Sequence, residues 1–162
     1  MNIKVFATGG TFDKEYDMLS GKLFFKESHL REMFTQGRCS IEIDLRTLMM
    51  IDSLEMTDTD REVVIHNCIH ADSNKIVITH GTDTMVKTAT AIAAAIKDKT
   101  IVLTGAMIPY KFGSSDGFFN LGAALAFVQT LPKGVYIAMN GRYFEWDKVR
   151  KNLKTGFFEE LE

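Results

Sequence analysis

The chain contains little cysteine and little proline, and its charges are nearly balanced. Its only two cysteines, Cys39 and Cys68, lie far apart in the sequence. Two such residues predict free thiols rather than a disulfide framework, as is usual for a cytoplasmic protein. The net charge is −2, and acidic and basic residues are mixed along the chain, so we expect no nucleic-acid partner.

Long apolar runs are absent as well. No stretch approaches the ~20 apolar residues that a membrane-spanning helix needs, so we expect no membrane partner. The first residues lead directly into an apolar, β-branched segment and lack the pattern of a signal peptide. Together these absences predict a cytoplasmic protein.

The residues that are present are typical of a folded domain. Of the 162 residues, 46% are hydrophobic and 25% are charged, which excludes an intrinsically disordered chain. This length suffices to bury one core, and no linker or repeat divides it. We therefore expect a single domain over residues 1–162.

Predicted strands and helices alternate along the chain. Buried strands are predicted at 3–7, 75–79, 101–104 and 135–139, the last being the final strand, and a half-exposed strand is predicted at 41–47. Helices are predicted at 27–34, from Thr57 to about residue 71, at 84–97 and at 116–131. Residues 18–23 are expected to form a turn or mobile loop, and residues 146–162 to be partly helical. Strands separated by helices predict an α/β fold, a three-layer sandwich with a mostly parallel sheet.

Two of the buried strands end in the same way, in a Gly–Thr turn. The strand at 3–7 leads to Thr11, and the strand at 75–79 leads to Thr82. Ligands of open parallel sheets bind at the carboxyl ends of the strands. Two such turns on neighbouring strands would bring two hydroxyl groups to one small molecule, and a threonine hydroxyl becomes a nucleophile when a base activates it.

Each of these residues also has a simpler interpretation. Thr11 can cap a turn, and Thr82 or Asp83 can cap the helix that follows. Lys151 belongs to a basic cluster with Lys148, Arg150 and Lys154, which by default is exposed to solvent. From residue types alone, both interpretations remain open.

The histidines do not indicate a metal site. His66 and His70 lie four residues apart on a predicted helix, but Asn67 stands where a metalloprotease motif would have glutamate. We interpret them as an ordinary helix face and expect no metal and no cofactor. His80 is expected to support the turn in which it lies.

Four sequence segments together resemble one family, the bacterial-type L-asparaginases. They are Ala-Thr-Gly-Gly-Thr at 7–11, Thr-His-Gly-Thr-Asp-Thr-Met at 79–85, Gly-Ala-Met at 105–107, and Ser-Asp-Gly-x-x-Asn-Leu at 115–121. The resemblance runs through essentially the whole chain, but only against the larger N-terminal domain of the family. We therefore expect a short, single-domain relative in which the family's C-terminal domain is absent.

The resemblance implies catalytic roles for five residues. Thr11 matches the nucleophile that forms the acyl-enzyme, and Thr82 matches the second catalytic threonine. Asp83 matches the acid that binds the substrate's α-amino group. Lys151 matches the catalytic lysine, because it follows residues 139–140 at the family's spacing. Tyr16 is the candidate for the tyrosine of the family's flexible loop.

The same resemblance implies a substrate-binding set of four residues. Ser53 matches a substrate-binding serine, and the backbone carbonyl of Ala106 matches one that contacts the substrate's side-chain amide. Gly10 and Gly81 belong to the two Gly–Thr turns, whose backbone N–H groups are suited to an oxyanion site.

The resemblance implies an amidohydrolase that releases ammonia from L-asparagine or a similar small amide. Thr11 would attack the amide carbon, and Thr82 with Lys151 would activate the water that resolves the ester. One alternative is a non-catalytic module that binds or senses an amino acid, and a less favoured one is a phosphate- or flavin-binding protein. We also expect a homodimer or homotetramer, because a single domain of this architecture would otherwise expose apolar surface.

Overall fold

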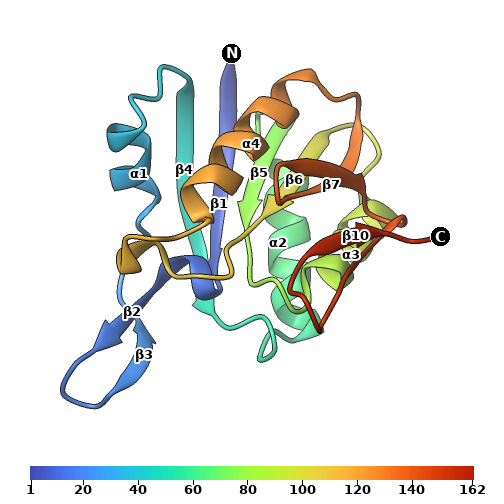
Figure 1. The fold of residues 1–162 in the computed structure, drawn as a ribbon. Helices are drawn as coiled ribbons and strands as arrows, with labels where there is room; N and C mark the ends of the chain where they lie inside the picture. The colour runs from blue at the N-terminus through green and yellow to red at the C-terminus, as the bar shows by residue number, and fades with distance from the viewer.

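The computed structural model describes residues Met1–Glu162 and is built on a six-stranded sheet (Figure 1). The strand order is β4-β1-β5-β6-β7-β8. Five strands are parallel: β1 (Asn2–Gly9), β4 (Glu42–Ile51), β5 (Lys75–Thr79), β6 (Thr100–Thr104) and β7 (Gly134–Met139). The sixth, β8 (Arg142–Glu145), is an antiparallel edge strand beside β7. The predicted α/β sandwich with a mostly parallel sheet is confirmed.

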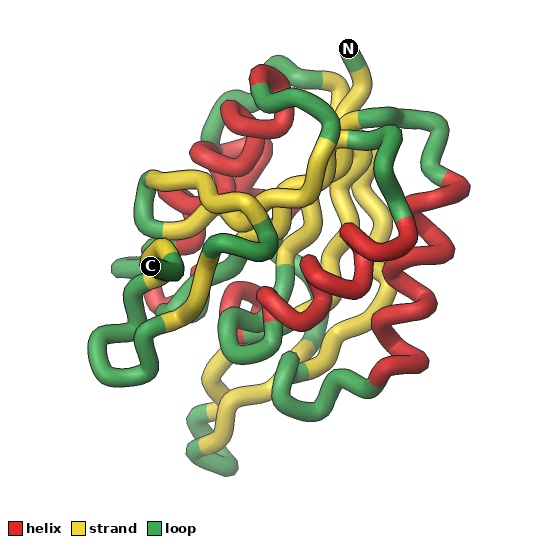
Figure 2. The backbone as a smooth tube through the Cα atoms, turned by 90° about the vertical axis from the view of Figure 1, so that its right-hand side faces the viewer, coloured by secondary structure: helices red, strands yellow, loops and turns green.

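Helices cover both faces of the sheet, as the side-on view in Figure 2 shows. Helices α2 (Asp58–His70) and α3 (Met85–Ala95) pack on one face, and α1 (Leu30–Gln36) and α4 (Gly117–Thr130) pack on the other. Side chains alternate along each strand, so Ile76 and Ile78 join the α2–α3 core while Val77 joins the α1–α4 core. The central residues of β5 and β6 are all apolar, as expected of strands that are buried on both faces. No helix is long and apolar enough to span a membrane.

Helix α2 begins directly after Thr57, close to the predicted start. The hydroxyl of Thr57 accepts a hydrogen bond from the backbone N–H of Asp60, and the Asp60 carboxylate accepts one from the backbone N–H of Thr57. This reciprocal capping box satisfies two N–H groups that would otherwise lack partners.

Two small hairpins extend from the sandwich. The first pairs β2 (Lys14–Asp17) with β3 (Lys22–Phe25), and its turn lies within the predicted loop at 18–23. The second pairs β9 (Val149–Lys151) with β10 (Phe158–Glu160). The prediction of a partly helical tail was therefore wrong, and 135–139 is not the last strand.

The second hairpin forms because it has a docking point on the body of the protein. Asn140 follows β7 with a left-handed backbone (φ 58°), and its side-chain oxygen accepts a hydrogen bond of 2.9 Å from the backbone N–H of Phe158. The Phe158 side chain is buried in the core beside α3. These contacts depend on residues distant in sequence, so local periodicity could not predict the hairpin.

Candidate active site

Three turns at the carboxyl edge of the sheet touch one another through glycine. Gly10 follows β1 with φ +75°, and a Cβ there would lie 2.4 Å from the backbone nitrogen of Gly81. A Cβ on Gly81 would in turn lie 2.6 Å from the hydroxyl oxygen of Ser53, in the segment after β4. No side chain fits at either position, so only glycine allows this approach. The turns that carry Thr11, Thr82 and Ser53 are thereby brought together.

Thr11 begins the short 3-10 helix η1 (Thr11–Asp13), directly after Gly10. Its side chain is half-buried, and its hydroxyl makes no hydrogen bond within the protein. Phe12 is fully buried beneath it and fixes the helix against the α1–α4 core. The hydroxyl of Thr11 is therefore held on a rigid turn and is available to a ligand.

Lys151 contacts the second Gly–Thr turn. Its Nζ donates hydrogen bonds of 2.8 Å to Thr82 Oγ1 and 2.7 Å to Asp83 Oδ1. The Lys151 side chain is only 11% exposed, whereas that of its neighbour Arg150 is 63% exposed and pairs with Glu159. Alternation along β9 thus turns Lys151 inward, out of the solvent-exposed basic cluster.

The helix-capping interpretation of this turn does not describe the structure. The N-cap of α3 is Thr84, and no side-chain hydrogen bond caps the helix. The hydroxyl of Thr82 is instead engaged with Lys151 and lies 3.6 Å from the sulfur of Met107.

The predicted binding residues Ser53 and Ala106 are almost fully buried, each 1% exposed. Ser53 Oγ accepts a hydrogen bond of 3.3 Å from the backbone N–H of Thr84. Ala106 follows β6 and packs beside Phe12 in the same core cluster. Both residues therefore lie at the edge of the sheet that carries the glycine turns.

Tyr16 is the one predicted site residue that the structure does not bring to this group. It lies in β2, its side chain is 56% exposed, and its hydroxyl has no hydrogen-bond partner. The β2–β3 hairpin projects from the body at the lower left of Figure 1. The hydroxyl of Tyr16 lies toward the hairpin turn, 3.9 Å from where a Cβ of Gly21 would stand.

Sequence reasoning missed Asp13, a fully buried carboxyl at the base of this hairpin. Its Oδ1 accepts hydrogen bonds from the hydroxyl of Ser28 and the backbone N–H of His29, whereas its Oδ2 has no partner. Burial raises the pKa of Asp13 to about 6, although both hydrogen bonds act to lower it. The carboxyl joins the two ends of the hairpin, and no short-range pattern signals such a closure.

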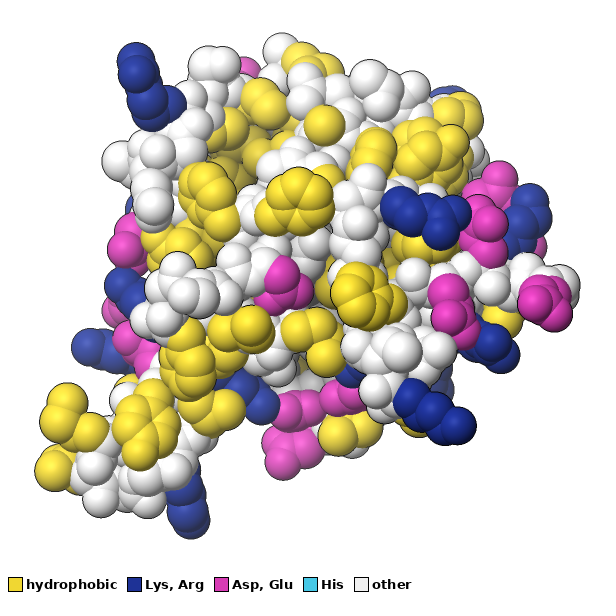
Figure 3. Space-filling view, in the orientation of Figure 1, with side chains coloured by type: hydrophobic (Ala, Val, Ile, Leu, Met, Phe, Trp, Pro, Cys, Tyr) yellow, Lys and Arg dark blue, Asp and Glu magenta, His cyan; other side chains and the backbone are white.

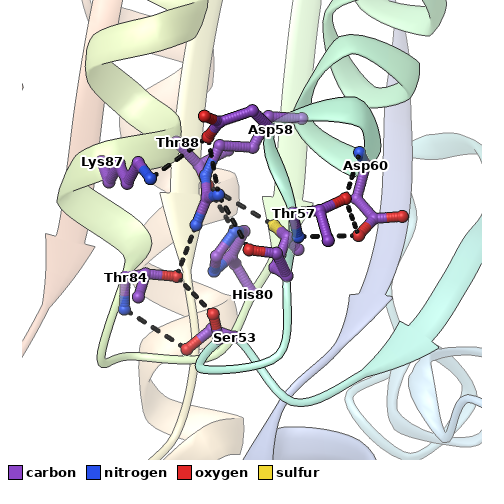
Figure 4. Close-up of polar contacts among 10 residues, drawn as sticks. Ser53, Thr57, Asp58, Asp60, His80, Thr84, Lys87 and Thr88 are labelled. Atoms are coloured by element: carbon purple, nitrogen blue, oxygen red, sulfur yellow. Dashed lines mark hydrogen bonds and ion pairs between the residues drawn. The ribbon is translucent and has the colours of Figure 1, made fainter.

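His80 supports its turn, as expected. The ring is fully buried, and burial lowers its pKa to about 4, so it is neutral at pH 7. Its Nδ1 lies 2.7 Å from the carbonyl oxygen of Gly81, and its Nε2 lies 2.8 Å from the hydroxyl of Thr88. Arg61, Thr84 and Thr88 were not predicted as part of the site, yet Arg61 bonds both threonines. Figure 4 shows these threonines beside His80 and Ser53.

The chain is similar in sequence to known asparaginases. The family model described as "Asparaginase, N-terminal" matches residues 2–158. L-asparaginase 1 of Escherichia coli K12 is 30% identical over 166 residues, which cover 96% of this chain and 49% of that protein. The glutaminase-asparaginase of Acinetobacter glutaminasificans is 35% identical over 123 residues, which cover 68% of this chain and 37% of that protein.

A solved structure has the same fold. The thermostable L-asparaginase from Thermococcus kodakarensis superposes with a TM-score of 0.88 and 27% identity, over 99% of this chain and 51% of that one. The chain spans about half the length of the curated relatives that it matches, or less.

Asp13 provides a test of the buried electrostatics around the first turn. The folded-state pKa lies above the ordinary value of 3.8, so its contribution to stability is full below that value and is lost as the pH rises through about 6. Asp13→Asn mimics the protonated acid. The variant should match the wild type near pH 4 and exceed its free energy of unfolding by about 2–3 kcal/mol at pH 8.

Urea unfolding measured across this pH range checks the expectation. The contribution of His80 to stability is lost as the pH falls, which is the opposite direction. Because both proteins contain His80, the difference between their free energies of unfolding reports on Asp13 alone. Asp98→Asn, at an exposed position, is the control and should show no such trend. A constant difference between Asp13→Asn and wild type at all pH values would contradict the assignment.

Proposed function

Because this chain belongs to the asparaginase family, we propose that it is an amidohydrolase that releases ammonia from L-asparagine or a similar small amide. The observation that carries the proposal is the hydrogen bond from Lys151 to Thr82, on a turn whose Gly81 touches the turn of Thr11. A binding module would need no buried lysine behind a threonine hydroxyl. Catalysis by a threonine uses such a pair.

In the first step, the Thr11 oxygen attacks the carbon of the substrate's side-chain amide. The hydroxyl is suited to this role because it makes no hydrogen bond within the protein. The C–N bond breaks, the proton of the Thr11 hydroxyl passes to the leaving nitrogen, which departs as ammonia, and an ester joins the acyl group to Thr11. Backbone N–H groups at the Gly10 and Gly81 turns would stabilise the oxyanion, and one such donor is worth ~3 kcal/mol.

In the second step, water resolves the ester and frees Thr11. Thr82 takes part in activating this water, with Lys151 as the proton acceptor behind it, which requires the lysine amine to be neutral. Asp83 now accepts a hydrogen bond from Lys151, and it is also the group that we assign to the α-amino group of the substrate. Substrate binding would therefore compete for the ion-pair partner of Lys151.

The remaining substrate contacts are assigned to buried groups beside the turns. We assign Ser53 to substrate binding, and the Ala106 carbonyl to the side-chain amide of the substrate. Both lie at the edge of the sheet that carries the two threonines. These groups would determine which amide substrate is preferred, and L-asparagine is the first substrate to test.

Tyr16 would act only if its hairpin moved toward the turns. The hairpin is joined to the body at Asp13 and by the ion pair of Lys14 with Asp52, next to Ser53. Closure over a bound substrate would bring Tyr16 to Thr11 and exclude bulk water.

We also propose that the chain associates into a homodimer or homotetramer. Apolar side chains lie exposed on the hairpin and on α4, among them Met18, Leu19 and Phe119 (Figure 3). A second copy would cover such surface.

Thr11→Ala should abolish ammonia release from L-asparagine, with a loss of at least about 10³-fold in kcat. Thermal stability should change little, because the hydroxyl has no partner in the protein. An enzyme-coupled ammonia assay measures the rate, and Thr130→Ala, at the exposed end of α4, is the control. Undiminished turnover would remove Thr11 as the nucleophile. A wild-type protein that binds asparagine without releasing ammonia would favour the sensing module.

Lys151→Met should slow turnover by about 10²–10⁴-fold, because it removes the proton acceptor behind Thr82. The matched control is Lys154→Met, which changes an exposed lysine of the same tail. The two variants should differ strongly in ammonia release. If their rates are equal, Lys151 has no role in the reaction.

Light scattering at working concentration should give a mass of at least twice the 18.2 kDa of one chain. When the protein is diluted, the mass measured by light scattering should fall toward that of one chain, and this fall should come before activity is lost to unfolding. A mass of 18.2 kDa throughout would contradict association.

A further inference from the structure

Arg61 is an unusual residue for the centre of a protein. Its side chain is 4% exposed, in the first turns of α2. The one carboxylate within ion-pair distance of its guanidinium belongs to Asp58, 3.3 Å away and itself 80% exposed, and that carboxylate also pairs with Lys87. Burying a charge with so weak a counterion costs stability unless hydrogen bonds satisfy the group.

The N–H groups of Arg61 instead bind the hydroxyls of two threonines: Thr88, which lies in α3, and Thr84, which directly precedes it. Its Nε donates to Thr88 Oγ1 at 3.0 Å, and one Nη donates to Thr84 Oγ1 at 3.0 Å. The other Nη donates to the backbone carbonyl of Met56 at 2.9 Å. The planar guanidinium fixes the directions of all three bonds at once.

The branch through Thr88 leads to the turn of Thr82. The carbonyl of Gly81 can only accept, so His80 Nδ1 carries the ring proton and His80 Nε2 accepts. The hydroxyl proton of Thr88 is then donated to Nε2, and the Thr88 oxygen accepts from Arg61. The Gly81 carbonyl thus sets the tautomer of His80, and Arg61 holds the other side of the ring through Thr88.

The branch through Thr84 leads to Ser53. The Thr84 hydroxyl accepts from Arg61 and donates to the backbone carbonyl of Ser53 at 2.8 Å. The backbone N–H of Thr84 donates to Ser53 Oγ at 3.3 Å. Figure 4 shows Ser53, Thr84 and Thr88 joined in one network around His80.

We propose that Arg61 is a positioning residue that sets the Ser53 segment and the Gly81–Thr82 turn relative to each other through these two branches. Its place in the reaction rests on the proposed function. The Thr84 branch governs substrate binding, because it holds Ser53. The Thr88 branch governs the chemical step, because it holds the turn that carries Thr82.

Variants of the two threonines separate the branches without removing the buried charge. Thr84→Val should raise KM for L-asparagine about tenfold with kcat changed less than about twofold, and Thr88→Val should lower kcat about tenfold. Thr84→Ser and Thr88→Ser keep the hydroxyls and should restore both constants to within about threefold of wild type. Thr90→Val, an exposed threonine of α3, is the matched control.

Kinetic constants equal to those of Thr90→Val in both valine variants would overturn the proposal. So would serine variants that fail to rescue, because the threonine methyl groups and not the hydroxyls would then matter.

Backbone hydrogen exchange gives a second readout that needs no activity. Thr84→Val should speed exchange in the Ser53 segment, and Thr88→Val should speed it at 80–84, while β5 and β6 stay protected. If the wild type hydrolyses no amide, the proposed function fails and these exchange patterns alone decide on Arg61. Unchanged exchange in both segments would then overturn its positioning role.

Discussion

Close backbone contact at Gly10 and Gly81 holds the turns of the candidate site together. Gly10, Gly81 and Ser53 come from three different turns, and a Cβ at either glycine would collide with the next turn. The contact works only because parallel strands β1, β4 and β5 are neighbours that end at one edge of the sheet. Everything proposed for Thr11 and Thr82 follows from this approach, since it brings two hydroxyl-bearing turns to one small molecule.

A second set of contacts completes the site from the far end of the chain. Asn140 docks the β9–β10 hairpin through Phe158, and alternation along β9 then turns Lys151 toward Thr82. A third set, centred on Arg61, lies behind the turns. The site therefore combines elements separated by up to about 140 residues in sequence, and each is held by hydrogen bonds to a backbone group.

The strands and the Gly–Thr turns were predictable from sequence because both depend on short-range patterns. β5 and β6 each have three consecutive apolar residues at their centre, and Gly10 and Gly81 are each followed directly by a threonine. The tail was not predictable, because Phe158 and Lys151 owe their positions to partners on other elements. Arg61 was missed for the same reason: its partners Thr84 and Thr88 lie 23 and 27 residues away. Tyr16 was predicted from a resemblance alone, and the structure leaves it exposed on a hairpin.

In the proposed reaction, the turn of Thr11 holds the substrate where Thr82 and Lys151 can act on it. Trapping the acyl-enzyme tests this most directly. Lys151→Met is mixed with L-asparagine, quenched in acid and digested, and its peptides are analysed by mass spectrometry. An aspartyl ester on Thr11 should accumulate, because its hydrolysis is slowed in this variant. Turnover with an ester on any other residue, or with none at Thr11, would contradict the proposed reaction.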